Sequence, residues 1–155
     1  MEDHDKVEYK IRLKHFCASL IEQRKEMARL SVENAREITN LEEKSTVGDK
    51  YETARAMGQL EQDMYSRQLA ENMKELADLQ TVDAGRIYKD VEPGGFVRCG
   101  DLNFFIAAGL GKHIFEGEQI VFLSPHAPLA RTLLLKKAGE EFHFHDKVFR
   151  IVELF

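Results

Sequence analysis

Neither proline nor glycine occurs between Val7 and Leu41, and this uninterrupted stretch constrains the chain more than any other feature of its sequence. A periodic stretch of about 35 residues without a helix breaker predicts one α-helix roughly 50 Å long. A helix of that length exceeds what the core of a small compact domain can cover. We therefore expect it to project as one half of an elongated two-helix structure.

A second helical pattern runs from near Asp49 to about Leu79, with Gly58 as its only interior breaker. Two helices of similar length joined by a short bend pack antiparallel, and heptad-spaced apolar residues indicate a coiled coil. Residues 1–80 are therefore predicted to form an antiparallel coiled-coil hairpin. The expected contact residues are Leu13, Phe16, Cys17, Leu20, Met27, Leu30, Ile38 and Leu41 in the first helix, and Met57, Leu60, Met64, Leu69, Met73 and Leu76 in the second.

The bend between the helices, with its tip near residues 44–52, contains two carboxylates, Asp49 and Glu52. Ser45-Thr46-Val47-Gly48 interrupts the helical pattern, and Asp49 with Glu52 three residues later fits a capping box. A second interpretation is that the pair is offered to a partner. Two carboxylates within one helical turn can hold a hard cation such as Mg²⁺ through a few oxygens and leave other positions open.

The second half of the chain, residues 81–155, is predicted to be a β-rich globular domain. Nine of the ten phenylalanines follow residue 95, which indicates a compact core there. The pattern predicts strands at 86–88, 96–99, 102–108, 118–123, 141–145 and 148–155, and a short helix at 128–135. Residues 107–112 are interpreted as a turn and not as a phosphate loop. The fold class is therefore α+β, with an antiparallel sheet and one short helix after the two-helix coiled coil.

The last predicted hairpin can be given a register. A two-residue turn at Asp146-Lys147 pairs Phe144 with Phe149 and places Phe142, Phe144, Phe149 and Ile151 on one face. His143 and His145 then point to the other side. They are either exposed strand residues or, with His126, metal ligands.

The charge balance and the cysteines limit the function classes. The net charge is −5, and residues 1–80 hold 13 Lys and Arg against 17 Asp and Glu, so direct binding to free nucleic acid is not expected. Cys17 and Cys99 lack metal-type spacing and are expected to be free buried thiols. No signal peptide and no apolar run long enough for a membrane span are found, which predicts a cytoplasmic protein.

Two motifs resemble the bacterial Gre transcript-cleavage factors (GreA/GreB-like transcription elongation factors). At the tip, Gly48-Asp49-Lys50-Tyr51-Glu52-Thr53-Ala54 is similar to the family's Gly-Asp-x-x-Glu-Asn-Ala. In the second half, the segment from Ser124-Pro125 to Leu134 and the following turn at 136–140 resemble the family's Ser-Pro…Ala-Leu and Gly-Lys-x-x-Gly-Asp segments. The likeness extends over nearly the whole chain and implies that residues 81–155 resemble the FK506-binding-protein (FKBP) fold.

The resemblance implies a function. Gre factors insert their coiled coil into the secondary channel of RNA polymerase and stimulate the polymerase's own cleavage of backtracked RNA. Asp49 and Glu52 would be lent to the polymerase active site to hold its second Mg²⁺, so the chain would carry no cofactor of its own and would not itself be an enzyme. Lys50, Tyr51, Ser124 and Pro125 would contact the partner, and the RNA 3′ end would be met only inside the complex. The chain would act as a monomer, with no membrane and no free DNA as partners.

Two alternatives remain open. Thr53 stands where the family has asparagine, and Leu135 where it normally has glycine. The chain could therefore be a secondary-channel regulator or inhibitor of transcription that does not stimulate cleavage. It could also be an interaction module unrelated to polymerase, in which the FKBP-like face binds another protein.

Overall fold

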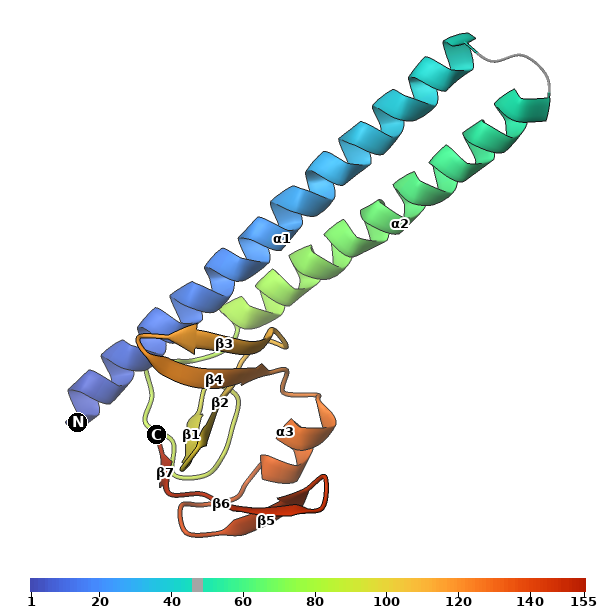
Figure 1. Cartoon of the computed structure of the whole chain (residues 1–155). Coiled ribbons are helices and arrows are strands. Elements are labelled where there is room, and N and C mark those ends of the chain that lie inside the picture. Colours follow the sequence, from blue (N-terminus) through green and yellow to red (C-terminus); the bar gives the residue numbers. More distant parts are fainter. Residues whose placement is uncertain (46–48) are drawn as a thin grey trace. The chain divides into compact units, whose positions relative to one another are not determined.

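The computed structural model describes the backbone of residues 1–45 and 49–155 and the side chains of residues 1–41 and 52–155. The chain divides into two compact units (Figure 1). Unit 1 combines Met1–Ala18 with Asp78–Phe155, and unit 2 is Ser19–Ala77. The first turns of the N-terminal helix therefore pack with the C-terminal half of the chain. The two units are thus not separated by a single boundary after residue 80.

Unit 2 consists of the paired parts of two long helices, α1 (Asp3–Ser45) and α2 (Asp49–Gln80), which run antiparallel. The predicted helical hairpin is thus present, and both helices extend to within a few residues of their expected ends. A contact across the pair is made by Thr39 of α1, whose Oγ1 accepts a hydrogen bond of 3.3 Å from Gln62 Nε2 of α2. Thr39 Oγ1 also donates to the Ala35 carbonyl at 2.8 Å, so this hydroxyl is held from both helices.

The residues that pack between the two helices are mostly small, and the predicted contact stripe is wrong for much of its length. In α1 the buried positions of unit 2 are Ile21, Ala28, Ala35 and Thr39. In α2 the half-buried positions include Gly58, Gln62, Tyr65, Leu69 and Leu76. The large residues Met27, Leu30, Ile38, Leu41, Met57, Leu60, Met64 and Met73 are exposed instead. A heptad argument based on large apolar residues placed this seam incorrectly because the helices approach closely over alanine, threonine and glycine.

Unit 1 is built on a mostly antiparallel sheet. Its strands, among the described residues, are β1 (Phe96–Cys99), β2 (Leu102–Ile106), β3 (Gly111–Phe115), β4 (Glu118–Leu123) and β7 (Glu153–Leu154), in the order β3-β4-β2-β1-β7. The neighbouring strands β2 and β4 are parallel. After β2 the chain forms β3 at the edge of the sheet, and β4 then runs antiparallel to β3 in the space between β3 and β2, in the same direction as β2. The antiparallel sheet predicted from the sequence is present, with this one parallel pair in it. The sequence prediction missed β3, and residues 86–88 form no strand.

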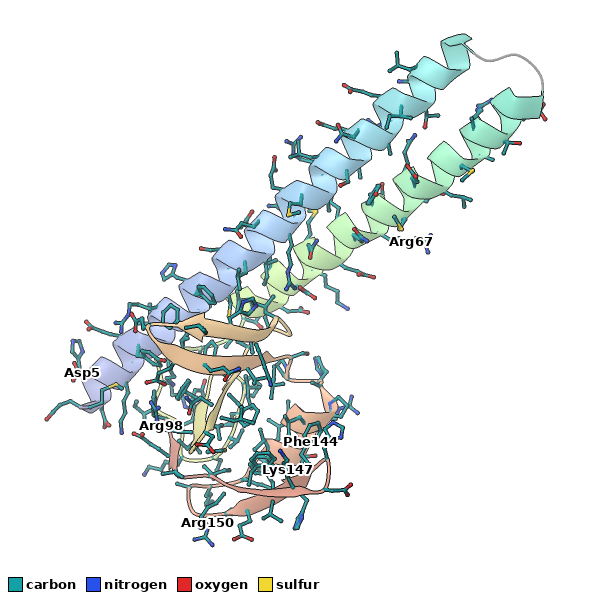
Figure 2. All side chains as sticks on the ribbon, in the orientation of Figure 1. Asp5, Arg67, Arg98, Phe144, Lys147 and Arg150 are labelled. Carbon is teal, nitrogen blue, oxygen red and sulfur yellow. The ribbon has the colours of Figure 1, made fainter. Side chains whose placement is uncertain are left out.

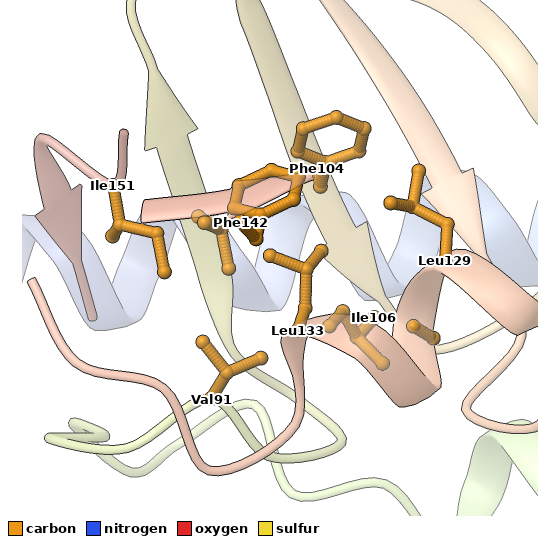
Figure 3. Close-up of a cluster of buried hydrophobic side chains, with 9 residues drawn as sticks. Val91, Phe104, Ile106, Leu129, Leu133, Phe142 and Ile151 are labelled. Carbon is orange, nitrogen blue, oxygen red and sulfur yellow. The ribbon is translucent and has the colours of Figure 1, made fainter. Parts of the chain in front are cut away.

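Each face of this sheet is covered by a different part of unit 1. One face packs on the short helix α3 (Pro128–Leu133) and on a hairpin of β5 (Glu141–Phe144) and β6 (Lys147–Arg150). The core on this side contains Val91, Val97, Phe104, Ile106, Leu129, Ala130, Leu133, Phe142 and Ile151 (Figure 3). The other face packs on the first turns of α1, where Tyr9 lies edge-on to Phe96 and Phe16 contacts Phe115 and Phe122. The observed fold is therefore α+β, as predicted.

The β5–β6 hairpin differs from its predicted register. The turn is formed by His145 and Asp146, with φ angles of 49° and 60°, and not by Asp146-Lys147. Left-handed conformation at both central residues is what a type I′ hairpin turn requires, and aspartate tolerates it well. Phe142 consequently pairs with Phe149, and their rings stack at 5.3 Å.

The predicted core face of this hairpin nevertheless remains correct. The slip moves each pairing by an even number of positions, so Phe142, Phe149 and Ile151 still share one side. The strand expected over 148–155 is interrupted after Arg150, and β7 pairs with β1 in the other sheet. The end of the chain is thereby fixed to the sheet that also packs on α1.

Candidate functional site

The strongest candidate site is the end of the hairpin where α1 stops at Ser45 and α2 begins at Asp49. The side chains of Asp49, Lys50 and Tyr51 lie outside the described residues, as does any capping contact made by Asp49. Glu52 is described and is exposed. Positions three apart on a helix lie on neighbouring sites of one face, so Glu52 belongs to the same face as position 49. The positive end of the α2 dipole favours negative charge here.

This arrangement suits cation chemistry of a limited kind. Two carboxylates one turn apart can supply two to four oxygens to a hard divalent ion, fewer than the six ligands that Mg²⁺ requires. The remaining ligands would have to come from water or from another molecule. The described part of the chain contains no group of three or more side chains suited to binding a metal. A pair of carboxylates at these positions would therefore leave most of the ion's coordination sites to water or to another molecule.

Charge along the middle of α1 is partly compensated by pairs on the same helix. Glu22 pairs with Lys25 at 2.9 Å, and Arg29 bridges Glu26 and Glu33 at 2.6 Å and 2.8 Å (Figure 2 draws the side chains). The hydrogen bond from Arg29 lowers the pKa of Glu26 below its usual value. These pairs keep this flank of the helix highly charged and well solvated.

Two lysines of α1, which the sequence prediction did not single out, fix the connector that follows α2. Lys10 Nζ donates to the Arg86 carbonyl and lies 4.6 Å from the centre of the Tyr88 ring. Lys14 Nζ donates to the Val82 carbonyl at 2.6 Å. Lys10 is fully buried, and burial lowers its pKa to about 8. A sequence signal could have identified Lys10 and Lys14. Together with Lys6 they recur one helical turn apart, next to the apolar residues Tyr9 and Leu13.

Ser124 and Pro125, predicted partner contacts, form the half-buried loop between β4 and α3. Ser124 Oγ accepts a hydrogen bond of 3.2 Å from the His126 backbone, and its carbonyl accepts one of 3.1 Å from Ala127. These bonds account for the Ser-Pro sequence as a local turn. Ser124 and Pro125 belong to unit 1, whereas position 49 and Glu52 belong to unit 2.

The histidine and cysteine candidates are not brought together. His143 lies on β5, His145 is in the type I′ turn and His126 is exposed before α3. Cys17 and Cys99 are free thiols, and burial raises their pKa values to about 12 and about 11. A thiol that stays protonated near neutral pH is a poor nucleophile and a poor metal ligand. Both cysteines are therefore packing residues.

Comparison with family models, curated proteins and solved structures found no match to this chain. Within the described residues, no helix combines the length and the apolar character that crossing a membrane requires.

Proposed function

We propose that the chain is a transcription elongation factor of the Gre type, which inserts its helical hairpin into the secondary channel of RNA polymerase. The carboxylates of Asp49 and Glu52 would complete the coordination of the polymerase's second Mg²⁺ and so accelerate cleavage of backtracked RNA. The observation that supports this most is the start of α2 at Asp49, with Glu52 exposed in its first turn. The small residues in the seam also allow the two helices to lie close together, and a narrow pair suits entry into a confined channel.

In this proposal the chain contributes ligands and not a complete active site. A carboxylate near a weakly held metal ion raises the fraction of complexes in which that ion is bound. The bound ion would supply an activated water as the nucleophile, and the cleavage rate would depend on the fraction of complexes that hold the second ion. The proposal thus predicts a specific dependence on Mg²⁺ concentration, which a purely structural role of the tip would not produce.

The test uses a stalled, backtracked polymerase complex with RNA labelled at its 5′ end. The 155-residue chain should accelerate RNA shortening, and Asp49→Asn or Glu52→Gln should slow it at least about tenfold at low Mg²⁺. Raising the Mg²⁺ concentration should restore part of the lost rate. Glu71→Gln, an exposed carboxylate farther along α2, is the matched control and should behave like the wild type.

A competition measurement separates this proposal from the alternatives. If the wild-type chain shortens no RNA but displaces a known cleavage factor from polymerase, the chain is a secondary-channel regulator without cleavage activity. If it neither shortens RNA nor competes, both polymerase proposals fail. The remaining candidate is then an interaction module that uses unit 1 to bind another protein.

A further inference from the structure

Leu135 is an exposed apolar residue in a backbone conformation that its side chain disfavours. Helix α3 has its C-cap at Leu134, so Leu135 is the first residue beyond the helix, and its φ angle is 68°. Glycine is the usual residue at this position, because a Cβ is crowded in the left-handed region. Of the described apolar residues other than glycine, only Leu135 has a positive φ.

The capping of α3 does not explain this leucine. A helix that ends in a left-handed residue often packs an apolar side chain of the cap against its last turn, which would bury that side chain. Leu135 is instead 72% exposed. A single leucine on a protein surface is ordinary. A leucine that is exposed at a position where glycine would remove the strain has neither a packing reason nor a backbone reason to be there.

The backbone around Leu135 is fixed from both sides. Its N–H donates to the Val91 carbonyl at 2.8 Å, and the Val91 N–H donates to the Lys136 carbonyl at 2.8 Å. The Lys136 N–H in turn donates to the Leu133 carbonyl at 3.1 Å. Val91 and Leu133 are fully buried in the core (Figure 3). Strained residues persist where the surrounding structure determines their conformation, and they cluster at functional sites.

The charge around this leucine has one sign. From Arg131 to Lys137 the chain holds three basic residues and no aspartate or glutamate. Lys137 pairs with Asp90 at 3.5 Å. In the part of the chain that the structure describes, Arg131 and Lys136 form no ion pair. Two uncompensated positive charges therefore flank the exposed leucine, and a surface that matches them is acidic.

We infer that Leu135 is an anchor residue, which enters an apolar pocket of a partner protein while Arg131 and Lys136 face carboxylates at the rim of that pocket. The inference rests on the proposed function and takes RNA polymerase as the partner. An apolar side chain at the centre with polar groups around it is the usual arrangement of a protein interface. The rigid backbone of Leu135 lowers the cost of binding, because little conformational freedom is lost when the side chain enters the pocket.

The test measures the affinity of the 155-residue chain for immobilised RNA polymerase core enzyme. Leu135→Gly should raise the dissociation constant at least about tenfold. Leu135→Met keeps an apolar side chain of similar size and should stay within about threefold of the wild type. Arg131→Glu should also raise the dissociation constant, and its affinity should fall less with added salt than that of the wild type. The concentration that gives half-maximal RNA shortening should rise for the same variants.

Ile114→Thr is the matched control. Ile114 is 74% exposed in the same unit and lies in strand β3, and threonine keeps the β-branched side chain that a strand favours. This variant should bind like the wild type. Urea unfolding of each variant separates binding from folding. Leu135→Gly should be at least as stable as the wild type, so its weaker binding cannot be attributed to unfolded protein.

The outcomes separate this inference from the proposed function. If the wild type binds polymerase and Leu135→Gly binds equally well, the inference is overturned and the proposed function stands. Equal weakening by Ile114→Thr and Leu135→Gly also overturns the inference, because the effect is then not specific to the anchor. If the wild type does not bind polymerase, the proposed function and the inference fail together.

Discussion

Replacing Gly58 with alanine should destabilise the hairpin, although alanine is the better helix former by about 1 kcal/mol. An ideal Cβ at position 58 would overlap Thr39 Oγ1 and lie 3.2 Å from Thr39 Cβ. Thr39 is buried, and its hydroxyl is held by the Ala35 carbonyl and by Gln62. The side chain cannot turn away without losing these bonds.

The magnitude follows from these contacts. Losing two hydrogen bonds at about 0.5–1.5 kcal/mol each, or separating the helices at about 1–3 kcal/mol, outweighs the gain in helix propensity. Set against a propensity gain of about 1 kcal/mol, a loss of about 1–3 kcal/mol means that Gly58→Ala should lower the free energy of unfolding by up to about 2 kcal/mol. The assay is urea unfolding followed by circular dichroism at 222 nm, which reports chiefly on the two long helices.

A double-mutant cycle tests the cause. Thr39→Ala removes the overlapping hydroxyl, so Gly58→Ala should be at least about 1 kcal/mol less damaging in that background. Ala56→Gly, at an exposed position of the same helix, measures propensity without packing and should cost about 1 kcal/mol. The reasoning is refuted if Gly58→Ala stabilises the chain by the propensity difference alone, or if the two substitutions are simply additive.

Two further predictions concern unit 1. Leu135 is 72% exposed and adopts a φ of 68°, a conformation that favours glycine. Leu135→Gly should therefore relieve backbone strain with little loss of packing. Urea titrations should show a free energy of unfolding higher by about 0.5–1 kcal/mol. A lower urea midpoint would contradict this. Lys10 has a folded-state pKa of about 8, below the ordinary 10.5, so the unfolded chain binds more protons between these values. As the pH rises from 8 to 10.5, the free energy of unfolding of the wild type should therefore increase relative to that of Lys10→Met by up to about 3 kcal/mol. A difference between the two free energies that does not change with pH would rule this out.

The helices and most strands could be predicted because their signals are local. The absence of proline and glycine over 7–41 fixes the first helix, and Gly100-Asp101 fixes the turn between β1 and β2. The β5–β6 turn was placed one residue late because Asp146 suits either central position of a tight turn. The conformation of His145, with φ of 49°, decides between them, and the sequence does not display it.

The pairing of distant segments could not be read in the same way. The strand β3 pairs only along one side. Its exposed positions are Lys112 and Ile114, so an apolar isoleucine lies on the outer face, and the sequence lacks the polar–apolar alternation that marks a half-buried strand. Its edge position is what places β4 parallel to β2. For the candidate site, the sequence predicted the start of α2 at Asp49 and the exposure of Glu52, but not the anchoring of the connector by Lys10 and Lys14. Buried lysines are rare, so a single sequence gives them little weight.

The seam of the hairpin links the fold to the proposed function. Interhelical distance depends on the side chains at the contact, and alanine, threonine and glycine permit close approach. A pair closed over Ala35, Thr39 and Gly58 is narrower than one closed over leucine and isoleucine, which suits entry into a confined channel. The same small side chains bury little apolar area, and the large residues that would otherwise fill a seam lie outside it. A narrow hairpin of this kind therefore leaves its large apolar side chains on the outside of both helices.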